Sequence, residues 1–401
     1  MPDLAPFRGL RYTAGPDLTA VTAPPYDVID AQERASLLAS HPNNAVRLIL
    51  PEGPGDEAYD TARATLAAWR AAGILSVDPD PALYAYRMDE PRSEGATHRT
   101  IGVIGALALP NPDADDILPH ERTLPKAKSD RLALLRATKA NFDPIWGLTL
   151  ASGLAALVDA VPPLARSVDA EGVVHEVGRI DDPERIATVR ALVASEPMVL
   201  ADGHHRFETA CTYRAETDGP GTDAILALVV SLDDVRLDVR PFHRLVRGAP
   251  ADLRGRLAEL WSVHPAGAAT PETIARLVAD MERADALGLV DAEGAALLVP
   301  TPGLPPVLGG LPEPLRDVDA ARFDVAVKPF LGGATLAYRS DAASVARVVL
   351  AGEADSAVLL RGVHVEEIRD AAHARVLMPE KTTYFAPKPR TGMVMRTLDG
   401  S

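Results

Sequence analysis

The feature that most constrains this chain is the point near residue 200 where a short apolar run ends in five polar or flexible residues. The run from Met198 to Leu200 has the composition of a short buried strand. The segment from Phe207 to Glu216 has the spacing of a helix. Between them lies Asp202-Gly203-His204-His205-Arg206. A strand that turns through glycine into a helix has the geometry of a phosphate site.

The residues of this turn have different expected roles. Gly203 allows the backbone to turn sharply and to approach a ligand. If the helix begins near His204, the amides of its first turn favour an anionic oxygen, and Arg206 adds a forked cation that suits phosphate. Asp202 would repel phosphate, so we expect it to hold Mg²⁺ or to orient a hydroxyl group. The residues expected to bind the cofactor here are Gly203, His204, His205, Arg206 and Thr209.

A structural alternative exists for the same turn. Asp202 can simply cap the helix, in which case both histidines are surface residues.

A second polar cluster, His120–Thr123, lies between Pro119 and Pro125. The prolines make its backbone irregular, and loops on a rigid scaffold often carry catalytic side chains. Glu121 is expected to accept the proton of a substrate hydroxyl, which requires a reach of about 2.6–3.2 Å. The alternative is a surface ion pair with a neighbouring cation, worth about 0–1 kcal/mol. The residues expected to be catalytic are His120, Glu121 and Asp202.

Cations and hydroxyl groups also gather near the C-terminus, between prolines that stiffen the backbone. Lys381, Lys388 and Arg390 are expected to help bind the anionic cofactor, because a stiff loop loses little entropy when it wraps an anion. The alternative is a solvated terminal strand.

Composition excludes several classes of protein. The formal net charge of −15 would repel a polyanion, so we expect no nucleic-acid partner. A single cysteine, Cys211, cannot form an intrachain disulfide, which fits the cytoplasm. The N-terminus lacks the apolar region of a signal peptide, and no run of about 18 apolar residues is present, so we expect no membrane partner.

The segment from Asp202 to Arg206, followed by a helix, resembles the signature of the ParB/sulfiredoxin superfamily, whose members bind nucleotide phosphates at a Gly-x-His-Arg turn. It is most similar to the archaeal free serine kinases, which are ADP-dependent enzymes that phosphorylate L-serine. In those kinases a Pro-His-Glu segment comes first, as Pro119-His120-Glu121 does here. Sulfiredoxins carry a cysteine where this chain has His204, so the resemblance does not extend to sulfiredoxin chemistry.

Three further blocks resemble the bacterial and archaeal family called domain of unknown function 1015, and this resemblance spans nearly the whole chain. The blocks are Ala23–Ile29, His120–Pro125, and Met378–Phe385 with Pro387–Arg390.

The alternation of elements predicts an α+β fold with mixed sheets. By resemblance, its core is ParB/sulfiredoxin-like and nucleotide-binding. We expect an N-terminal α/β subdomain at 1–95, the core at 96–248 with an insertion around 151–185, and a C-terminal α/β subdomain at 249–401. Two local expectations are a strand at Val46–Leu50 and a Pro/Gly-rich loop between subdomains at 300–314.

Together these observations predict a nucleotide-dependent phosphotransferase that acts on a small hydroxylated metabolite. By resemblance, L-serine is the leading acceptor, the nucleotide is ATP or ADP, and Mg²⁺ is the metal. The alternative is a regulatory module that binds or hydrolyses nucleotide without a small-molecule acceptor.

Overall fold

The computed structural model describes residues 1–92, 96–110, 116–119, 128–232 and 238–399. Within these residues the chain forms two compact units. The first contains the described residues up to 232 and those from Pro387 onward, and the second contains Asp238–Ala386. The sequence led us to expect three consecutive segments instead. The structure draws the boundaries differently because strands from both the 1–95 and the 151–185 segments pair within the sheet of the first unit.

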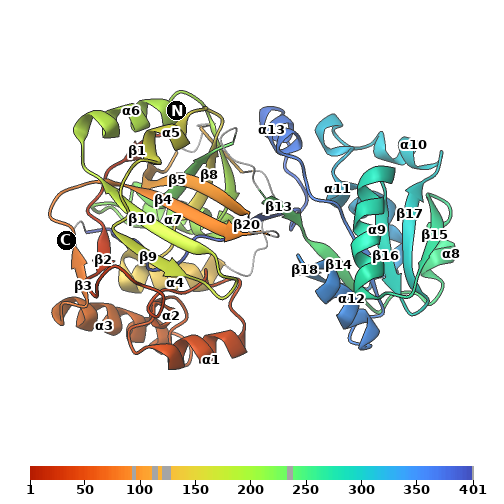
Figure 1. Ribbon diagram of the computed structural model, residues 1–401, viewed down its shortest axis with the longest axis horizontal. Helices are drawn as coiled ribbons and strands as arrows, with labels where there is room; N and C mark the ends of the chain where they lie inside the picture. Colours follow the sequence, from red (N-terminus) through yellow and green to blue (C-terminus); the bar gives the residue numbers. More distant parts are fainter. Residues whose placement is uncertain (93–95, 111–115, 120–127, 233–237, 400–401) are drawn as a thin grey trace. The chain divides into compact units, whose positions relative to one another are not determined.

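The first unit is built on a mixed sheet whose strand order is β6-β11-β8-β12-β5-β4-β10-β9, with β1 paired to β5 (Figure 1). Its strands are β1 (Leu4–Ala5), β4 (Leu83–Pro91), β5 (Thr97–Ala108), β6 (Ile117–Pro119), β8 (Ile145–Thr149), β9 (Ala165–Val168), β10 (Val174–Ile180), β11 (Met198–Asp202) and β12 (Ala224–Ser231). The pairs β6–β11 and β8–β12 are parallel and the other pairs antiparallel, which confirms the α+β class with mixed sheets.

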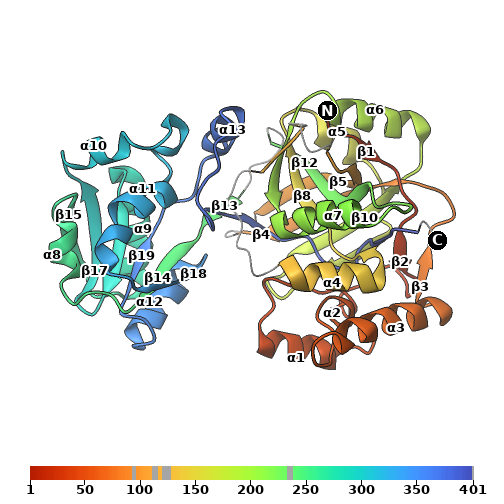
Figure 2. The ribbon, with the colours of Figure 1, turned by 180° about the vertical axis from the view of Figure 1, so that it is seen from behind.

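Helices and two small strand pairs complete this unit. The helices are α1 (Ala31–Ser40), α2 (Val46–Ile49), α3 (Glu57–Ala71), α4 (Lys128–Thr138), α5 (Leu154–Val158), α6 (Pro183–Val193) and α7 (His204–Glu216). The pairs are β2 (Leu10–Tyr12) with β3 (Leu75–Val77), and β7 (Ala140–Asn141) with β21 (Arg396–Thr397). Helix α7 packs against β8 and β12, and α4 packs against α7 (Figure 2).

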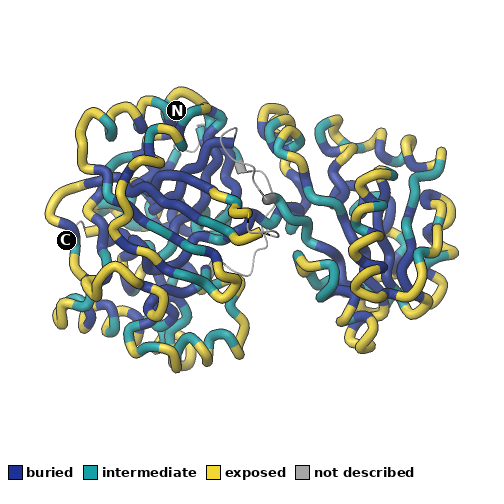
Figure 3. Tube along the Cα trace, viewed as in Figure 1, coloured by how far each residue is buried: buried dark blue, intermediate teal, exposed yellow. Residues whose placement is uncertain are grey.

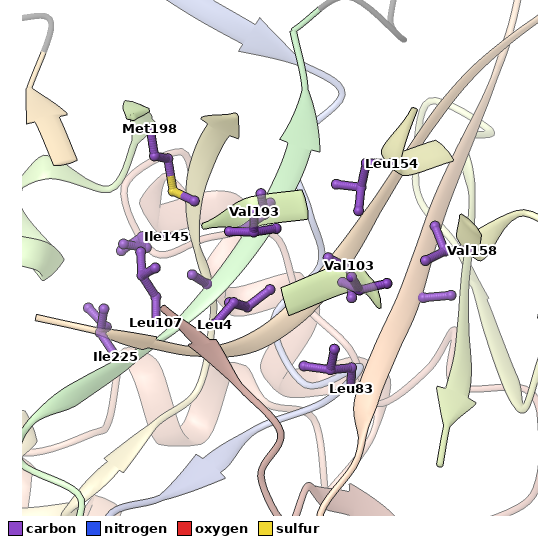
Figure 4. Close-up of a cluster of buried hydrophobic side chains, with 14 of the residues drawn as sticks. Leu4, Leu83, Val103, Leu107, Ile145, Leu154, Val158, Val193, Met198 and Ile225 are labelled. Atoms are coloured by element: carbon purple, nitrogen blue, oxygen red, sulfur yellow. The ribbon is translucent and has the colours of Figure 1, made fainter. Parts of the chain in front are cut away.

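The core of the first unit is formed by aliphatic side chains from the sheet and its helices. Figure 4 shows part of it, with Leu4, Leu83, Val103 and Ile145 from four strands and Leu154 from α5. These five side chains are fully buried. The strands that carry four of them are buried along most of their length (Figure 3). The sheet is therefore a rigid platform for the turn that follows β11.

The second unit has a six-stranded sheet with the order β15-β17-β16-β19-β14-β18, and a separate pair, β13 with β20. Its strands are β13 (Asp238–Pro241), β14 (His243–Arg247), β15 (Trp261–Gly267), β16 (Leu287–Asp291), β17 (Gly294–Pro300), β18 (Thr335–Arg339), β19 (Ser356–Leu359) and β20 (Thr383–Ala386). Its helices are α8 (Leu253–Leu257), α9 (Pro271–Ala284), α10 (Leu304–Leu308), α11 (Asp319–Ala326), α12 (Ala342–Leu350) and α13 (Val365–His373).

Helix α9 shows how the sequence specifies this unit. The Thr270 hydroxyl accepts from the Thr273 amide at 3.2 Å, and Pro271 occupies the first turn, where a missing amide hydrogen costs little. The apolar face of α9 packs with α12 and the sheet in one core cluster.

Two local expectations were wrong. Val46–Leu50 is not a strand, because Val46–Ile49 forms helix α2, and the Asn44 side chain accepts from the Val46 amide at 2.9 Å. A run of five apolar residues does not distinguish a strand from a buried helical turn. The segment 300–314 does not separate subdomains, since it contains α10 and lies inside the second unit. Among the described residues, no helix combines the length and the apolar composition that crossing a bilayer requires.

Candidate functional site

The turn between β11 and α7 has the strand–glycine–helix geometry expected from the sequence. A β-bulge between Leu200 and Asp202 shifts the register against β8 just before the turn. Gly203 has φ of 86°, in the left-handed region that glycine adopts without strain. A Cβ atom there would also lie 2.9 Å from Ile145 Cγ2. The first bond of α7 runs from the Phe207 amide to the Gly203 carbonyl at 2.9 Å, so the preceding amides point toward the Asp202 end of the helix.

Asp202 contacts two cations. Its Oδ2 accepts from Arg206 at 2.9 Å, and its Oδ1 accepts from the ammonium of Lys388. Burial alone would raise the pKa of Asp202, but Lys388 and Arg206 hold that pKa below its usual range. Asp202 is therefore ionised, and its charge is balanced by side chains of the protein.

Arg206 points into the protein rather than only toward the turn. It donates to Asp143 Oδ2 and to the Pro144 carbonyl at 2.6 Å, in addition to Asp202. Burial raises the pKa of Asp143, and the Arg206 guanidinium partly offsets this rise. The planar fork of Arg206 thus joins the first turn of α7 to the residues that enter β8.

Asp143 is a member of this candidate site that sequence reasoning missed. It lies 63 residues before Arg206, and its side chain is only 9% exposed. The only signal in the sequence was the dipeptide Asp143-Pro144, which is typical of a turn and says nothing about a distant arginine.

The C-terminal segment Pro387–Leu398 brings Lys388 to the site. It runs through the first unit, where Thr391 and Ala23 exchange backbone hydrogen bonds and β21 pairs with β7. Arg390 does not contact Asp202. Its guanidinium donates to the Thr22 carbonyl at 3.0 Å, so in this structure it anchors the segment.

Lys381 belongs to the second unit. Its ammonium lies 5.2 Å from the centre of the Phe242 ring, and its carbonyl accepts from Arg244 at 2.9 Å. A cofactor role for Lys381 stays a prediction.

His204 and His205 occupy the first turn of α7 and are partly exposed, and Thr209 lies one turn further. The Thr209 side chain is 4% exposed, and its hydroxyl has no hydrogen-bond partner among the described residues. Together with Asp143 and Arg206 it lines a cavity of about 50 Å³. A space of this size suits ordered water rather than a nucleotide, so a nucleotide would have to lie outside it.

His120 and Glu121 lie outside the described residues. The strand before them, β6, pairs in parallel with β11, and Pro119 lies opposite Leu200. The carboxyl ends of β6 and β11 therefore lie at the same edge of the sheet. The catalytic roles of His120 and Glu121 stay predictions.

The described residues around Asp202 do not by themselves supply the ligands of a magnesium site. In the part of the chain that the structure describes, no three His, Cys, Asp or Glu side chains are grouped so that they could hold a metal ion. Mg²⁺ prefers several oxygen ligands, whereas Asp202 faces an ammonium and a guanidinium group. The described donor set does not fit the ion, and Asp202 as a metal ligand remains a prediction.

Comparison with known families identifies the relatives of this chain. The model of a family described as "Protein of unknown function (DUF1015)" matches residues 4–321. The chain belongs to the DUF1015 family. This confirms the family that the sequence blocks indicated. No curated protein matches this DUF1015 chain.

Several solved structures are similar to this DUF1015 protein at low sequence identity. A variant of free serine kinase in complex with ADP is 14% identical, with a TM-score of 0.39 over 71% of this chain and 87% of the kinase. Free serine kinase in complex with AMP is 16% identical, with a TM-score of 0.38 over the same shares of the two chains. A conserved hypothetical protein from Pyrococcus furiosus is 13% identical, with a TM-score of 0.40 over 74% of this chain and 96% of that protein.

Proposed function

We propose that this DUF1015 protein is a nucleotide-dependent phosphotransferase that acts on a small hydroxylated metabolite. The observation that carries the proposal is the convergence of Asp202, Arg206 and Lys388 at the N-terminal end of α7. The two cations neutralise Asp202, so this end of the helix does not repel an anion. The positive end of the helix dipole and the nearby ammonium of Lys388 then favour phosphate oxygens.

The nucleotide and the acceptor come from the resemblance of the Asp202–Arg206 turn to the Gly-x-His-Arg turn of the ParB/sulfiredoxin superfamily. Within that resemblance, ATP or ADP is the phosphate donor and free L-serine is the leading acceptor. The amides around Gly203, His204 and His205 would cradle the donor phosphates, while Lys388 would balance charge that develops during transfer.

Glu121 is the proposed base. It follows Pro119 by two residues, and Pro119 pairs with Leu200 at the sheet edge where Asp202 lies. In the proposed step the acceptor hydroxyl gives its proton to the Glu121 carboxylate, and its oxygen bonds to the terminal phosphorus. The bond between that phosphorus and the bridging oxygen breaks, and the departing nucleotide keeps the electron pair. Positioning and charge neutralisation provide the catalysis.

The test measures how much phosphorylated product forms for each nucleotide consumed. The intact protein is first melted with ADP, ATP or CTP, with and without Mg²⁺, and the stabilising nucleotide is then incubated with L-serine and other hydroxylated metabolites. We expect a phosphorylated metabolite, detected by mass spectrometry, in a 1:1 ratio to nucleotide consumed. Formation of only inorganic phosphate and the shorter nucleotide would contradict the proposal and indicate the regulatory module.

A pair of carboxylate variants sharpens this test. In the proposed step the Asp202 carboxylate orients the acceptor hydroxyl, so Asp202→Asn should lower product formation about 100-fold or more while some nucleotide binding persists. Asp78→Asn is the matched control, because Asp78 is also a buried carboxylate paired with an arginine, Arg11, but it has no contact with the turn. The control should lose stability without a selective loss of turnover. An Asp202→Asn protein with unimpaired turnover would remove Asp202 from the mechanism.

A further inference from the structure

A chain of hydrogen-bonded polar side chains links β10 to the neighbouring strand β4 in the sheet of the first unit. His175 on β10 is fully buried, and its Nε2 lies 3.2 Å from Asp169 Oδ2. Its Nδ1 lies 3.0 Å from the hydroxyl of Tyr86 on β4, which is 1% exposed. Buried polar groups of this kind are costly unless each one has a partner. The chain Asp169–His175–Tyr86 therefore fixes the position of the Tyr86 hydroxyl.

The direction of each hydrogen bond follows from the protonation of His175. Burial lowers the pKa of His175, although Asp169 opposes this, so the imidazole is neutral at neutral pH. A neutral ring that donates from Nε2 to Asp169 must accept at Nδ1. The Tyr86 hydroxyl then donates to His175, and its oxygen is available to accept another hydrogen bond.

That second bond comes from the C-terminal segment. The backbone amide of Arg390 donates to the Tyr86 hydroxyl at 2.9 Å. Arg390 is two residues after Lys388, whose ammonium contacts Asp202. A backbone anchor at this distance limits where Lys388 can reach, because two residues span only about 7 Å. The Arg390 side chain, bound to Thr22, anchors the same residue from its other end.

We propose that Tyr86 is a positioning residue for the phosphate site: its hydroxyl holds the backbone at Arg390 and thereby keeps the Lys388 ammonium on Asp202, with His175 and Asp169 orienting that hydroxyl. The part of this proposal that concerns phosphate binding rests on the proposed function. The placement of Lys388 itself does not, and it can be measured without any ligand.

The same strand offers a matched control. Tyr84, two residues before Tyr86 on β4, is also fully buried, and its hydroxyl also accepts from a backbone amide, that of Gly9, at 2.9 Å. It donates to Asp78 at 2.7 Å, as Tyr86 does to His175. Neither Gly9 nor Asp78 contacts the Lys388 region. Tyr84→Phe therefore removes an equivalent buried hydroxyl without touching the anchor of Lys388.

The first measurement is the reactivity of Lys388 toward acetic anhydride in the folded protein, read by mass spectrometry relative to the exposed Lys328 in the same sample. We expect Tyr86→Phe to increase Lys388 labelling about three- to tenfold, the factor that corresponds to one lost hydrogen bond. Tyr84→Phe should leave Lys388 labelling at the wild-type level. Equal labelling in wild type and Tyr86→Phe, or an equal increase in both variants, would overturn the proposal.

The second measurement is the affinity for ADP by calorimetry, with pyrophosphate as a probe of the phosphate part alone. Tyr86→Phe should weaken both about three- to tenfold, and Tyr84→Phe neither. If the wild-type protein binds neither probe, the proposed function fails, while the labelling result still decides the placement of Lys388. Should Tyr86→Phe not fold, His175→Gln replaces it, because it removes the Nδ1 acceptor and must likewise raise Lys388 labelling. Unchanged labelling in His175→Gln would overturn the proposal.

Discussion

The ammonium of Lys388 contacts the carboxylate of Asp202, although 186 residues separate them in the sequence. Asp202 ends β11, the second strand from one edge of the sheet, whereas Lys388 lies on the C-terminal segment that crosses the first unit. The charged group around Asp202, where we propose that phosphate binds, is therefore assembled from distant parts of the chain, and its charge balance depends on how the C-terminal segment is held.

Replacing Lys388 by methionine tests this charge balance. The variant keeps the apolar stem of the side chain and loses the ammonium, and Asp202 retains Arg206 as a partner. We expect the protein to fold and the binding of ADP to weaken by about 1–3 kcal/mol, the range for hydrogen bonds to charged groups. Calorimetric titration at constant ionic strength measures this.

Lys328→Met is the control for the loss of one lysine charge. Lys328 lies in the second unit, its side chain is 54% exposed, and it forms a surface pair with Asp324 at 3.5 Å. Such pairs contribute about 0–1 kcal/mol, so ADP binding should not change. Equal affinities of Lys388→Met and wild type would show that Lys388 does not serve the site.

Gly203→Ala tests the geometry of the turn. Alanine at a φ of 86° costs about 1–2 kcal/mol, and its Cβ would approach Ile145 Cγ2 to 2.9 Å, which adds about 1–3 kcal/mol of overpacking. We therefore expect the free energy of unfolding to fall by about 2–5 kcal/mol in urea titrations.

Gly15→Ala separates these two contributions. Gly15 has φ of 87°, but nothing lies within 4 Å of a Cβ built on it. Its substitution should cost only the conformational part, about 1–2 kcal/mol. Losses of the same size for both variants would mean that the turn relaxes around the new methyl group.

Arg206→Lys tests the role of the guanidinium fork. Lysine keeps the charge but cannot reach Asp143, the Pro144 carbonyl and Asp202 together, so we expect stability to fall by about 1–3 kcal/mol and anion binding to weaken. Arg214→Lys, on the same helix, is the control. Arg214 donates to the Leu109 and Pro110 carbonyls at 2.8 and 2.7 Å, so its replacement should affect stability alone. A parallel loss of anion binding in both variants would contradict a specific role for Arg206.

The strand, the glycine and the helix of the site could be predicted from the sequence because each depends on neighbouring residues. The left-handed φ of Gly203 is a property of glycine itself, so the turn can be predicted from that residue alone. The apolar run before it can be predicted as a strand because it only has to be buried in a sheet. Helices α9 and α12 depend on local sequence in the same way, because their apolar residues recur at helical spacing.

The partners of the site could not be predicted, because they come from elsewhere in the chain. Nothing in the spacing of Arg206 shows that Asp143 lies against it, and Lys381, Lys388 and Arg390 looked like one cluster. The structure assigns Lys381 to the second unit, Lys388 to Asp202, and Arg390 to Thr22. These three cations have different surroundings because the chain leaves the second unit at Ala386 and re-enters the first at Pro387. No change in composition shows this boundary in the sequence.

A last prediction concerns the pH dependence of the second unit. His243 is 3% exposed, and its Nδ1 accepts from the Leu360 amide at 3.2 Å. Burial, with a smaller contribution from Arg244, lowers the pKa of His243 to about 4, from 6.5. Between these values the unfolded chain binds a proton at His243 that the native protein does not bind. The contribution to stability is therefore fully present above pH 6.5 and is lost as the pH falls toward 4, by about 3 kcal/mol.

His243→Asn isolates this contribution, because the asparagine oxygen can still accept from Leu360 but does not titrate. Urea unfolding at a series of pH values from 7 to 4 should give a shallower decline for His243→Asn than for wild type. The difference in unfolding free energy between the two proteins should change by about 3 kcal/mol across this range. Taking this difference cancels the effects of groups that both proteins share, including the buried His175. His264→Asn, at an exposed histidine of β15, is the control and should keep the wild-type slope. Parallel curves for His243→Asn and wild type would show that His243 takes up its proton equally in the folded and unfolded states.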